Sequence, residues 1–174
     1  ERGKNNIRLM TADPKTGRVQ TILTDRDDAW VRPVREMEWI DEGKHFTWVS
    51  ERDGWRHAYL ASPAGGEPKL VTPGKFDVIE LSHVDAKRGW LYYIASPEKP
   101  TQRYLFRVRL DGTKNERLTP SDQPGTHRYD ISPDGNWAIH SYSTINTPPV
   151  TDLVALPGHK VIRVLEDNKK LREK

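Results

Sequence analysis

The sequence contains no cysteine among its 174 residues. That absence excludes disulfide bonds, thiolate zinc ligands and a cysteine nucleophile. The sequence also has no apolar stretch that approaches the ~18 residues needed to cross a bilayer, so it predicts no membrane span. The six histidines include no His-x-His or His-x-x-x-His pair of the kind that binds metal ions. Nothing in the sequence predicts a metal or another cofactor.

The sequence has no strong charge of either sign. It has 28 basic and 25 acidic side chains, which give a net charge of +3, and the basic residues are interspersed along the chain. The one basic run, residues 169–174, is interpreted as the solvated start of a helix. The charge pattern therefore predicts no nucleic-acid partner.

Apolar residues are also scarce, at 34% of the chain, but aromatic residues are not. Six Trp, six Tyr and three Phe remain, and disordered chains are usually poor in such residues. We therefore expect a folded protein with a thin, aromatic-rich core, which suits sheets better than a large helical bundle.

Three glycines mark an internal repeat. Gly43, Gly89 and Gly135 are spaced 46 residues apart, and each follows a short polar or charged turn. Each is preceded by a short apolar segment and leads into an aromatic-rich one. The preceding segments are 37–40, 79–84 and 129–131, and the following ones are 46–49, 90–94 and 137–139. The pattern predicts the same pair of strands three times.

The second half of each unit repeats as well. Each of three further strand-like segments passes through a glycine-containing turn into a final short segment. The pairs are 56–60 with 70–73, 104–110 with 118–120, and 151–156 with 161–165. Within 104–110, Tyr104, Phe106, Val108 and Leu110 share one face and Arg107 and Arg109 point the other way, as in a strand. Four short strands in roughly 45 residues are typical of a propeller blade.

The predicted fold is all-β: a partial β-propeller of about three and a half four-stranded antiparallel blades, with a short helix starting at the C-terminus. We assign residues 1–28 to the end of one blade, 29–74, 75–120 and 121–168 to three further blades, and 169–174 to the start of a linker helix. A β-sandwich is the alternative, but it does not require a 46-residue repeat. An open arc of blades exposes faces that a ring would bury. We therefore expect an internal segment of a longer protein, with the remaining blades or a second copy as partners.

Several strings resemble the propeller of dipeptidyl peptidase IV and its bacterial relatives, within the prolyl oligopeptidase family. The resemblance covers about four fifths of the chain, from residue 30 onward. The most specific string is Val-Leu-Glu-Asp-Asn at 164–168, which closes the propeller in that family. The other matching strings are Trp30-Val31, residues 50–60 (SERDGWRHAYL), 91–94 (LYYI), 103–107 (RYLFR) and the turn at 132–135 (SPDG).

The resemblance implies an exported serine dipeptidyl peptidase that releases N-terminal dipeptides with proline or alanine in second position. It implies that an α/β-hydrolase domain follows the linker helix at 169–174, and that the protein is periplasmic or secreted. The present segment would gate and position the peptide substrate. The alternative is a non-enzymatic scaffold propeller that binds proteins through its loops.

The sequence predicts no catalytic residue in this chain. No serine has glycines at positions −2 and +2, so the nucleophile elbow of the family is absent, and so is its pair of adjacent glutamates. One segment after Trp30-Val31 matches a family stretch that reaches substrate with an aromatic residue and an arginine. Arg35 stands at the arginine position and Val34 replaces the aromatic residue. Arg35 is thus the one substrate-binding candidate; the alternative is an arginine at the rim, in solvent.

The recurring tryptophans have two interpretations. Trp39, Trp48, Trp90 and Trp137 recur at strand positions in successive units. Recurrence at one strand phase favours core packing over a surface that stacks carbohydrate or RNA bases. By the same reasoning His57 is expected to be structural, and Arg52, Asp53 and Arg56 are expected to form a polar network that ties one hairpin to its neighbour.

Overall fold

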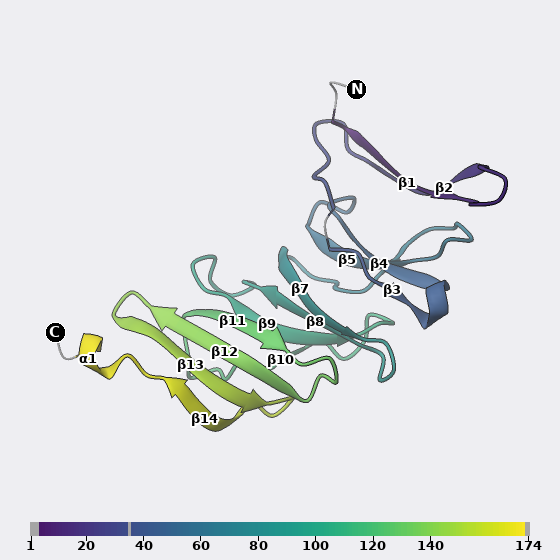
Figure 1. Ribbon diagram of the computed structural model, residues 1–174. Coiled ribbons are helices and arrows are strands. Elements are labelled where there is room, and N and C mark those ends of the chain that lie inside the picture. The colour runs from purple at the N-terminus through teal and green to yellow at the C-terminus, as the bar shows by residue number, and fades with distance from the viewer. Residues whose placement is uncertain (1–3, 35, 173–174) are drawn as a thin grey trace. The chain divides into compact units, whose positions relative to one another are not determined.

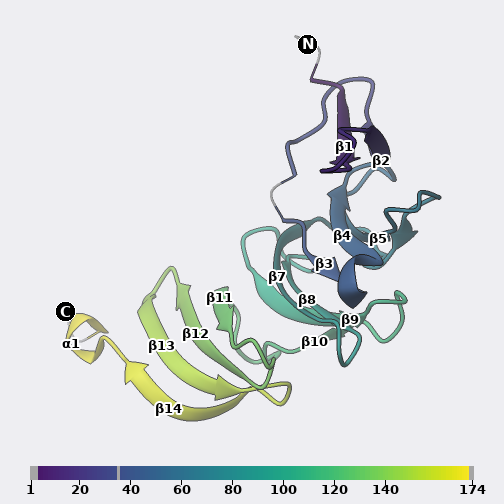
Figure 2. The ribbon, with the colours of Figure 1, turned by 45° about the vertical axis from the view of Figure 1, so that its right-hand side comes forward.

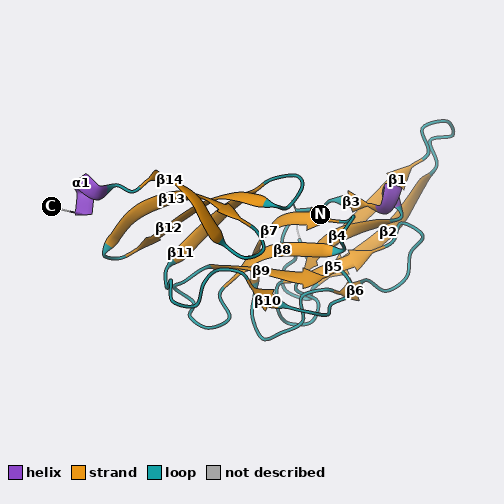
Figure 3. Cartoon of the chain, turned by 90° about the horizontal axis from the view of Figure 1, so that it is seen from below, coloured by secondary structure: helices purple, strands orange, loops and turns teal. Residues whose placement is uncertain are grey.

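The computed structural model describes residues 4–34 and 36–172 and consists almost wholly of β-strands (Figure 1). In these residues helix is confined to a 3₁₀ turn at Asp41–Gly43 and to α1 (Lys169–Arg172), as Figure 3 shows. The predicted all-β class is therefore confirmed. The chain divides into two compact units, Glu1–Lys75 and Phe76–Lys174, which are described separately.

The first unit holds a hairpin and a four-stranded sheet. The hairpin joins β1 (Asn6–Ala12) to β2 (Val19–Arg26), and both sheets are antiparallel. The sheet has its strands in chain order: β3 (Trp39–Ile40), β4 (His45–Ser50), β5 (His57–Ala61) and β6 (Lys69–Leu70). Every residue of β4 except the first is buried.

The core of the first unit joins these two sheets. Ile22 and Leu23 of β2 pack with side chains of the four-stranded sheet, which are Phe46, Trp48, Tyr59 and Ala61. Phe46 has no exposed surface. The apolar side chains of the hairpin and of the sheet thus form one continuous cluster, as the propeller prediction requires of neighbouring blades.

The second unit consists of two four-stranded antiparallel sheets that lie side by side (Figure 2). The first is formed by β7 (Val78–Asp85), β8 (Trp90–Ala95), β9 (Tyr104–Arg109) and β10 (Glu116–Arg117). The second is formed by β11 (Thr126–Ile131), β12 (Trp137–Thr144), β13 (Thr147–Ala155) and β14 (Lys160–Glu166). A shared core cluster lies between them, with Tyr92 and Leu105 from one sheet and Tyr129 and Val154 from the other.

The repeated glycines have the conformation that explains their spacing. Gly43, Gly89 and Gly135 have φ angles of 84°, 72° and 65°. These values lie in the left-handed region, which glycine adopts without a steric penalty from a β-carbon. Each glycine stands just before the second strand of its sheet, so the tight turn between the first two strands needs the same residue type every 46 positions.

A buried threonine recurs after the last strand of two sheets. The side-chain oxygen of Thr72 accepts the amide of Ala58 at 2.9 Å, and that of Thr119 accepts the amide of Leu105 at 2.8 Å. Both threonines precede a proline, in the repeated Val-Thr-Pro and Leu-Thr-Pro strings. The hydroxyl continues the pairing of the third strand beyond a fourth strand of only two residues.

The tryptophans fit the core-packing prediction only in part. Trp48 is 3% exposed, but Trp39 and Trp137 are 42% and 43% exposed. Trp39 and Trp137 are the first residues of β3 and β12, where fewer neighbouring side chains cover a ring. Trp90 lies between the guanidinium groups of Arg107 and Arg109, at 4.1 and 4.2 Å from its ring centre. Trp90 is also partly buried against the core cluster of the second unit, so cation–π contacts add to its core packing.

Candidate functional site

The substrate-binding candidate lies in the segment 30–38, which leads into the sheet of the first unit. Its start is fixed by Asp27, whose side chain accepts the amides of Trp30 at 3.0 Å and of Ala29 at 2.7 Å. These two hydrogen bonds hold the pKa of Asp27 below its usual range. The ammonium group of Lys4 lies 4.8 Å from the ring centre of Trp30.

The end of this segment is tied to the sheet. Glu36 forms an ion pair with Arg56, with 2.7 Å between Oε2 and Nη2, and both side chains are largely buried. The amide of Glu38 donates to the Thr47 hydroxyl at 3.0 Å, and the carbonyl of Glu38 accepts the Thr47 amide at 2.9 Å. The backbone is therefore anchored on both sides of position 35.

The structure describes Val34 but not Arg35. Val34 is half-buried and packs against the core cluster of the first unit. Arg35 lies outside the described residues, and its contact with substrate stays a prediction.

A polar network centred on Asp25 ties β4 to β2. Asp25 of β2 is 4% exposed and accepts three hydrogen bonds: from Trp48 Nε1 at 3.1 Å, from Ser50 Oγ at 2.8 Å and from Arg52 Nη2 at 3.4 Å. Arg52 also donates to Glu67 Oε1 at 3.1 Å. Of the three residues predicted to form a network, Arg52 thus joins the hairpin to the four-stranded sheet, whereas Asp53 pairs with His57 and Arg56 with Glu36.

His57 has the structural role that the sequence predicts. Its ring is 1% exposed, and Nδ1 lies 2.8 Å from Asp53 Oδ2. Burial by itself raises the pKa of Asp53, but the hydrogen bonds from His57 and from the Trp55 amide outweigh it and leave this pKa below its usual range. The pair fixes the loop before β5.

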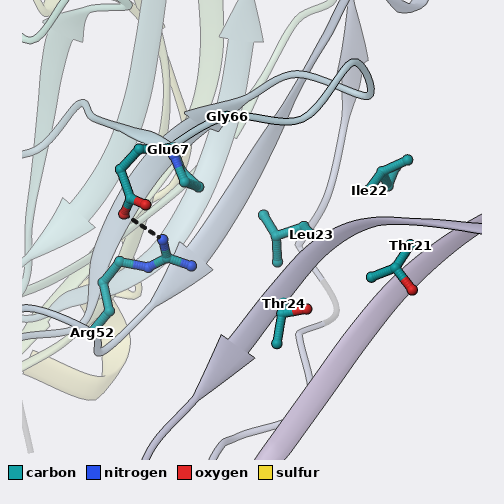
Figure 4. A pocket seen from close by; sticks show the side chains of 8 residues that line it. Thr21, Ile22, Leu23, Thr24, Arg52, Gly66 and Glu67 are labelled. Atoms are coloured by element: carbon teal, nitrogen blue, oxygen red, sulfur yellow. Dashed lines mark hydrogen bonds and ion pairs between the residues drawn. The ribbon is translucent and has the colours of Figure 1, made fainter.

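A shallow pocket of about 210 Å³ opens beside Arg52 (Figure 4). Arg52 is the one cationic group on its wall, and Asp25 and Glu67 already balance that charge. We therefore assign the pocket no binding chemistry. Its lining residues are Thr21, Ile22, Leu23, Thr24, Arg52, Gly66, Glu67 and Pro68.

A second hollow, of about 540 Å³, is lined by the tip of the β12–β13 hairpin and by Leu171, which carry no titratable side chain. Within residues 4–34 and 36–172, no three His, Asp or Glu side chains are placed to hold a metal ion. Nor does any helix there have the length and apolar character needed to span a bilayer.

Comparison with known proteins shows the family of this chain. A sequence model of the dipeptidyl peptidase IV (DPP IV) N-terminal region matches residues 1–149. The chain belongs to the dipeptidyl peptidase IV family. Its sheets are blades of the β-propeller in the N-terminal region, and the resemblance seen in the sequence is confirmed.

Two relatives show how much of a family member the chain represents. The crystal structure of Porphyromonas gingivalis dipeptidyl peptidase 4 superposes with a TM-score of 0.88 at 31% identity, over 99% of this chain and 24% of that one. The probable dipeptidyl-aminopeptidase B of Emericella nidulans is 33% identical over 167 residues, which are 90% of this chain and 18% of that protein. The chain thus spans a quarter or less of these relatives.

A third comparison supports the fold alone. The crystal structure of a putative dipeptidyl aminopeptidase IV from Bacteroides ovatus superposes over 95% of this chain with a TM-score of 0.79 at 21% identity. The same arrangement of blades is therefore kept at an identity too low to carry function.

Proposed function

We propose that this chain is a propeller segment of a bacterial, exported serine-type dipeptidyl peptidase that releases N-terminal dipeptides with proline or alanine in second position. The observation that carries the proposal is the family match over residues 1–149, together with the 31% identity to a bacterial dipeptidyl peptidase 4 across 99% of the chain. In this proposal the protein acts in the periplasm or after secretion.

In this proposal the segment gates and positions the peptide substrate, and an α/β-hydrolase domain elsewhere in the parent protein carries the catalytic residues. Support comes from the sequence, which has no nucleophile elbow and no pair of adjacent glutamates. The propeller gates the approach of peptides, and the anchored segment 30–38 presents Arg35 to a backbone carbonyl or carboxylate of the substrate. A scaffold propeller that binds proteins is the competing outcome of the tests.

The purified 174-residue chain is expected to release no chromophore from Gly-Pro or Ala-Pro amides above the rate of the uncatalysed reaction. The reason is that the chain holds no activated nucleophile. A chromogenic assay with a serine-directed inhibitor checks this, with a dipeptidyl peptidase as positive control. Inhibitor-sensitive release by the purified chain overturns the assignment of catalysis to another domain.

The isolated chain is also expected to self-associate through its exposed blade surfaces. In the described structure β14 pairs with β13 alone, and its side chains Val161, Ile162, Val164 and Leu165 are 44–54% exposed. An unpaired apolar edge strand promotes pairing with another chain. Light scattering on the wild type should give a mass above that of a monomer.

The substitution Val164→Lys places a charge on this edge. The variant should contain more monomer than the wild-type chain at the same concentration. Ile145→Lys is the matched control, because Ile145 is 99% exposed at a hairpin tip away from the edge. A wild type that stays monomeric at high concentration contradicts the proposal.

A further inference from the structure

The last sheet of the second unit buries four titratable side chains that the proposed function does not use. They come from different elements: His127 from β11, His140 from β12, Asp152 from β13 and His159 from the turn before β14. The two first-named imidazoles are each 1% exposed, and Asp152 and His159 are each 7% exposed. We refer to these four residues as the histidine cluster.

Hydrogen bonds fix the protons of the first two imidazoles. His127 Nε2 lies 3.0 Å from the carbonyl oxygen of Gln123, so this nitrogen carries the proton and donates it. Neutral His127 then has a bare Nδ1, which lies 2.8 Å from His140 Nε2 and accepts its proton. The remaining nitrogen of His140, Nδ1, faces Asp152 Oδ2 at 3.9 Å.

A second chain of hydrogen bonds ends on His159. The Thr119 hydroxyl oxygen accepts the Leu105 amide, which leaves its proton for Tyr129 Oη at 2.8 Å. Tyr129 in turn donates to His159 Nε2 at 2.7 Å. In this arrangement each imidazole is neutral and each hydroxyl has one donor and one acceptor role.

The rings around these hydrogen bonds are closely packed. His127 and His140 stack with 5.1 Å between ring centres, and Tyr129 stacks on His140 at 4.6 Å. Tyr104 of β9 and Tyr142 of β12 cover the pair, each within 5.7 Å of an imidazole. The cluster therefore joins β11, β12 and β13 to each other and to the neighbouring sheet.

An added proton conflicts with this geometry. While His140 keeps its proton on Nε2, a proton on His127 Nδ1 sets two N–H donors against each other at 2.8 Å, and a proton on His159 Nε2 opposes the donor of Tyr129. Relief of the first conflict requires His140 to carry its proton on Nδ1, which lies 3.9 Å from Asp152 Oδ2 and has no hydrogen-bond partner. The cation that faces the cluster from β10 is Arg117, whose guanidinium lies 3.6 Å from the Tyr104 ring centre. The carboxylate that faces it from β13 is Asp152, the one group here that favours a charged imidazole.

The electrostatic environment also disfavours protonation of the imidazoles. Burial, together with a smaller effect of charge on the nearby His159, lowers the pKa of His127 to about 4 and that of His140 to about 3. Burial also lowers the pKa of His159. Burial raises the pKa of Asp152, which opposes part of this effect because a protonated Asp152 is tolerated in the fold.

We propose that the histidine cluster is an acid-sensitive lock of the last propeller sheet, closed while its imidazoles are neutral and opened when they take up protons. The pKa of each imidazole is lower in the fold than in the opened chain, where it has the ordinary value of about 6.5. Above that pH the imidazole is neutral in both states, so the stability of the sheet does not depend on its titration. Stability is lost as the pH falls from there toward the folded values. The lock is thus closed near neutral pH and weakens in mildly acidic surroundings.

Hydrogen exchange on the full 174-residue chain tests the lock. Amides of 126–155 are compared with those of 78–95 in the same unit, at about pH 7.5 and about pH 5.5, after correction for intrinsic exchange. Titration of one imidazole in the open state raises the opening equilibrium roughly tenfold over this interval, so His127 and His140 together should raise it about a hundredfold. We expect this rise in 126–155, and a smaller one in 78–95.

The double substitution His127→Phe with His140→Phe keeps the stacked rings and removes the two titrating groups. It should abolish most of the pH dependence of 126–155, whereas His45→Phe, at a half-exposed histidine of the first unit, should leave it unchanged. Should the double variant fail to fold, NMR titration of the wild-type imidazoles decides. Imidazoles that titrate near pH 6.5 with the amides still protected overturn the proposal, and so does a folded double variant with undiminished acid sensitivity.

Discussion

Leu105→Ala is expected to lower the free energy of unfolding of the second unit by about 2–5 kcal/mol. Leu105 has no exposed surface and belongs to the core cluster shared by the two sheets, with Tyr92 and Ile94 from one side and Val154 from the other. Truncation removes methyl groups from the point where the sheets meet and leaves a cavity that the rigid strands cannot close. Urea unfolding followed by circular dichroism measures the change.

The matched control is Ile145→Ala. Ile145 is 99% exposed at the β12–β13 turn, so the same kind of truncation there should change the unfolding free energy by less than about 0.5 kcal/mol. A loss at Leu105 no larger than at Ile145 would show that the two sheets do not share a packed core.

Asp25→Ala is expected to lower the stability of the first unit by about 2–4 kcal/mol. The carboxylate of Asp25 is the common acceptor for Trp48 and Ser50 and the buried partner of Arg52. Its removal leaves the indole N–H without its acceptor inside the fold and weakens the link between β2 and β4. Urea unfolding monitored by tryptophan fluorescence reports on this region directly.

Two substitutions separate the causes of that loss. Asp25→Asn keeps an acceptor oxygen but not the charge, and it should lose less stability than Asp25→Ala. Asp28→Ala removes a carboxylate that is 99% exposed three residues away, and it should be nearly neutral. Equal losses for Asp25→Ala and Asp28→Ala would mean that the network adds no stability.

The repeat made most of the strand order predictable. A glycine at a fixed 46-residue interval marks the turn before the second strand. Its positive φ angle is a local property that the residue type itself indicates. Alternating segments such as 104–110 then locate the third strand, which the structure has at Tyr104–Arg109. These features are local, so they needed no knowledge of how sheets pack.

The packing of individual faces was less predictable. The alternation in 104–110 suggests one covered and one polar face, but Leu105 on the second face is as buried as Val108 on the first. The burial of such a strand depends on what packs against its sheet, and a pattern within a single strand does not contain that information. The exposed rings of Trp39 and Trp137 have the same origin, since their cover depends on other strands.

The candidate site shows the same limit. Arg52 is recognisable from its string, but its partner Asp25 stands 27 residues earlier, in another sheet. The members of the histidine cluster have no ligand-like spacing, and only the register brings them together: His140 is opposite Tyr129 on one side and Asp152 on the other. Pairing β11 with β12, and β12 with β13, as antiparallel neighbours was the sequence-level step that could have revealed the cluster.

The most direct test of the central claim is the release of dipeptides by the complete protein that contains this segment. With Ala-Pro and Gly-Pro amides as substrates, the complete protein should release the chromophore in a reaction that a serine-directed inhibitor stops. The 174-residue chain, assayed beside it at equal concentration, should release none. A complete protein that folds but cleaves neither amide would contradict the account and favour a scaffold propeller.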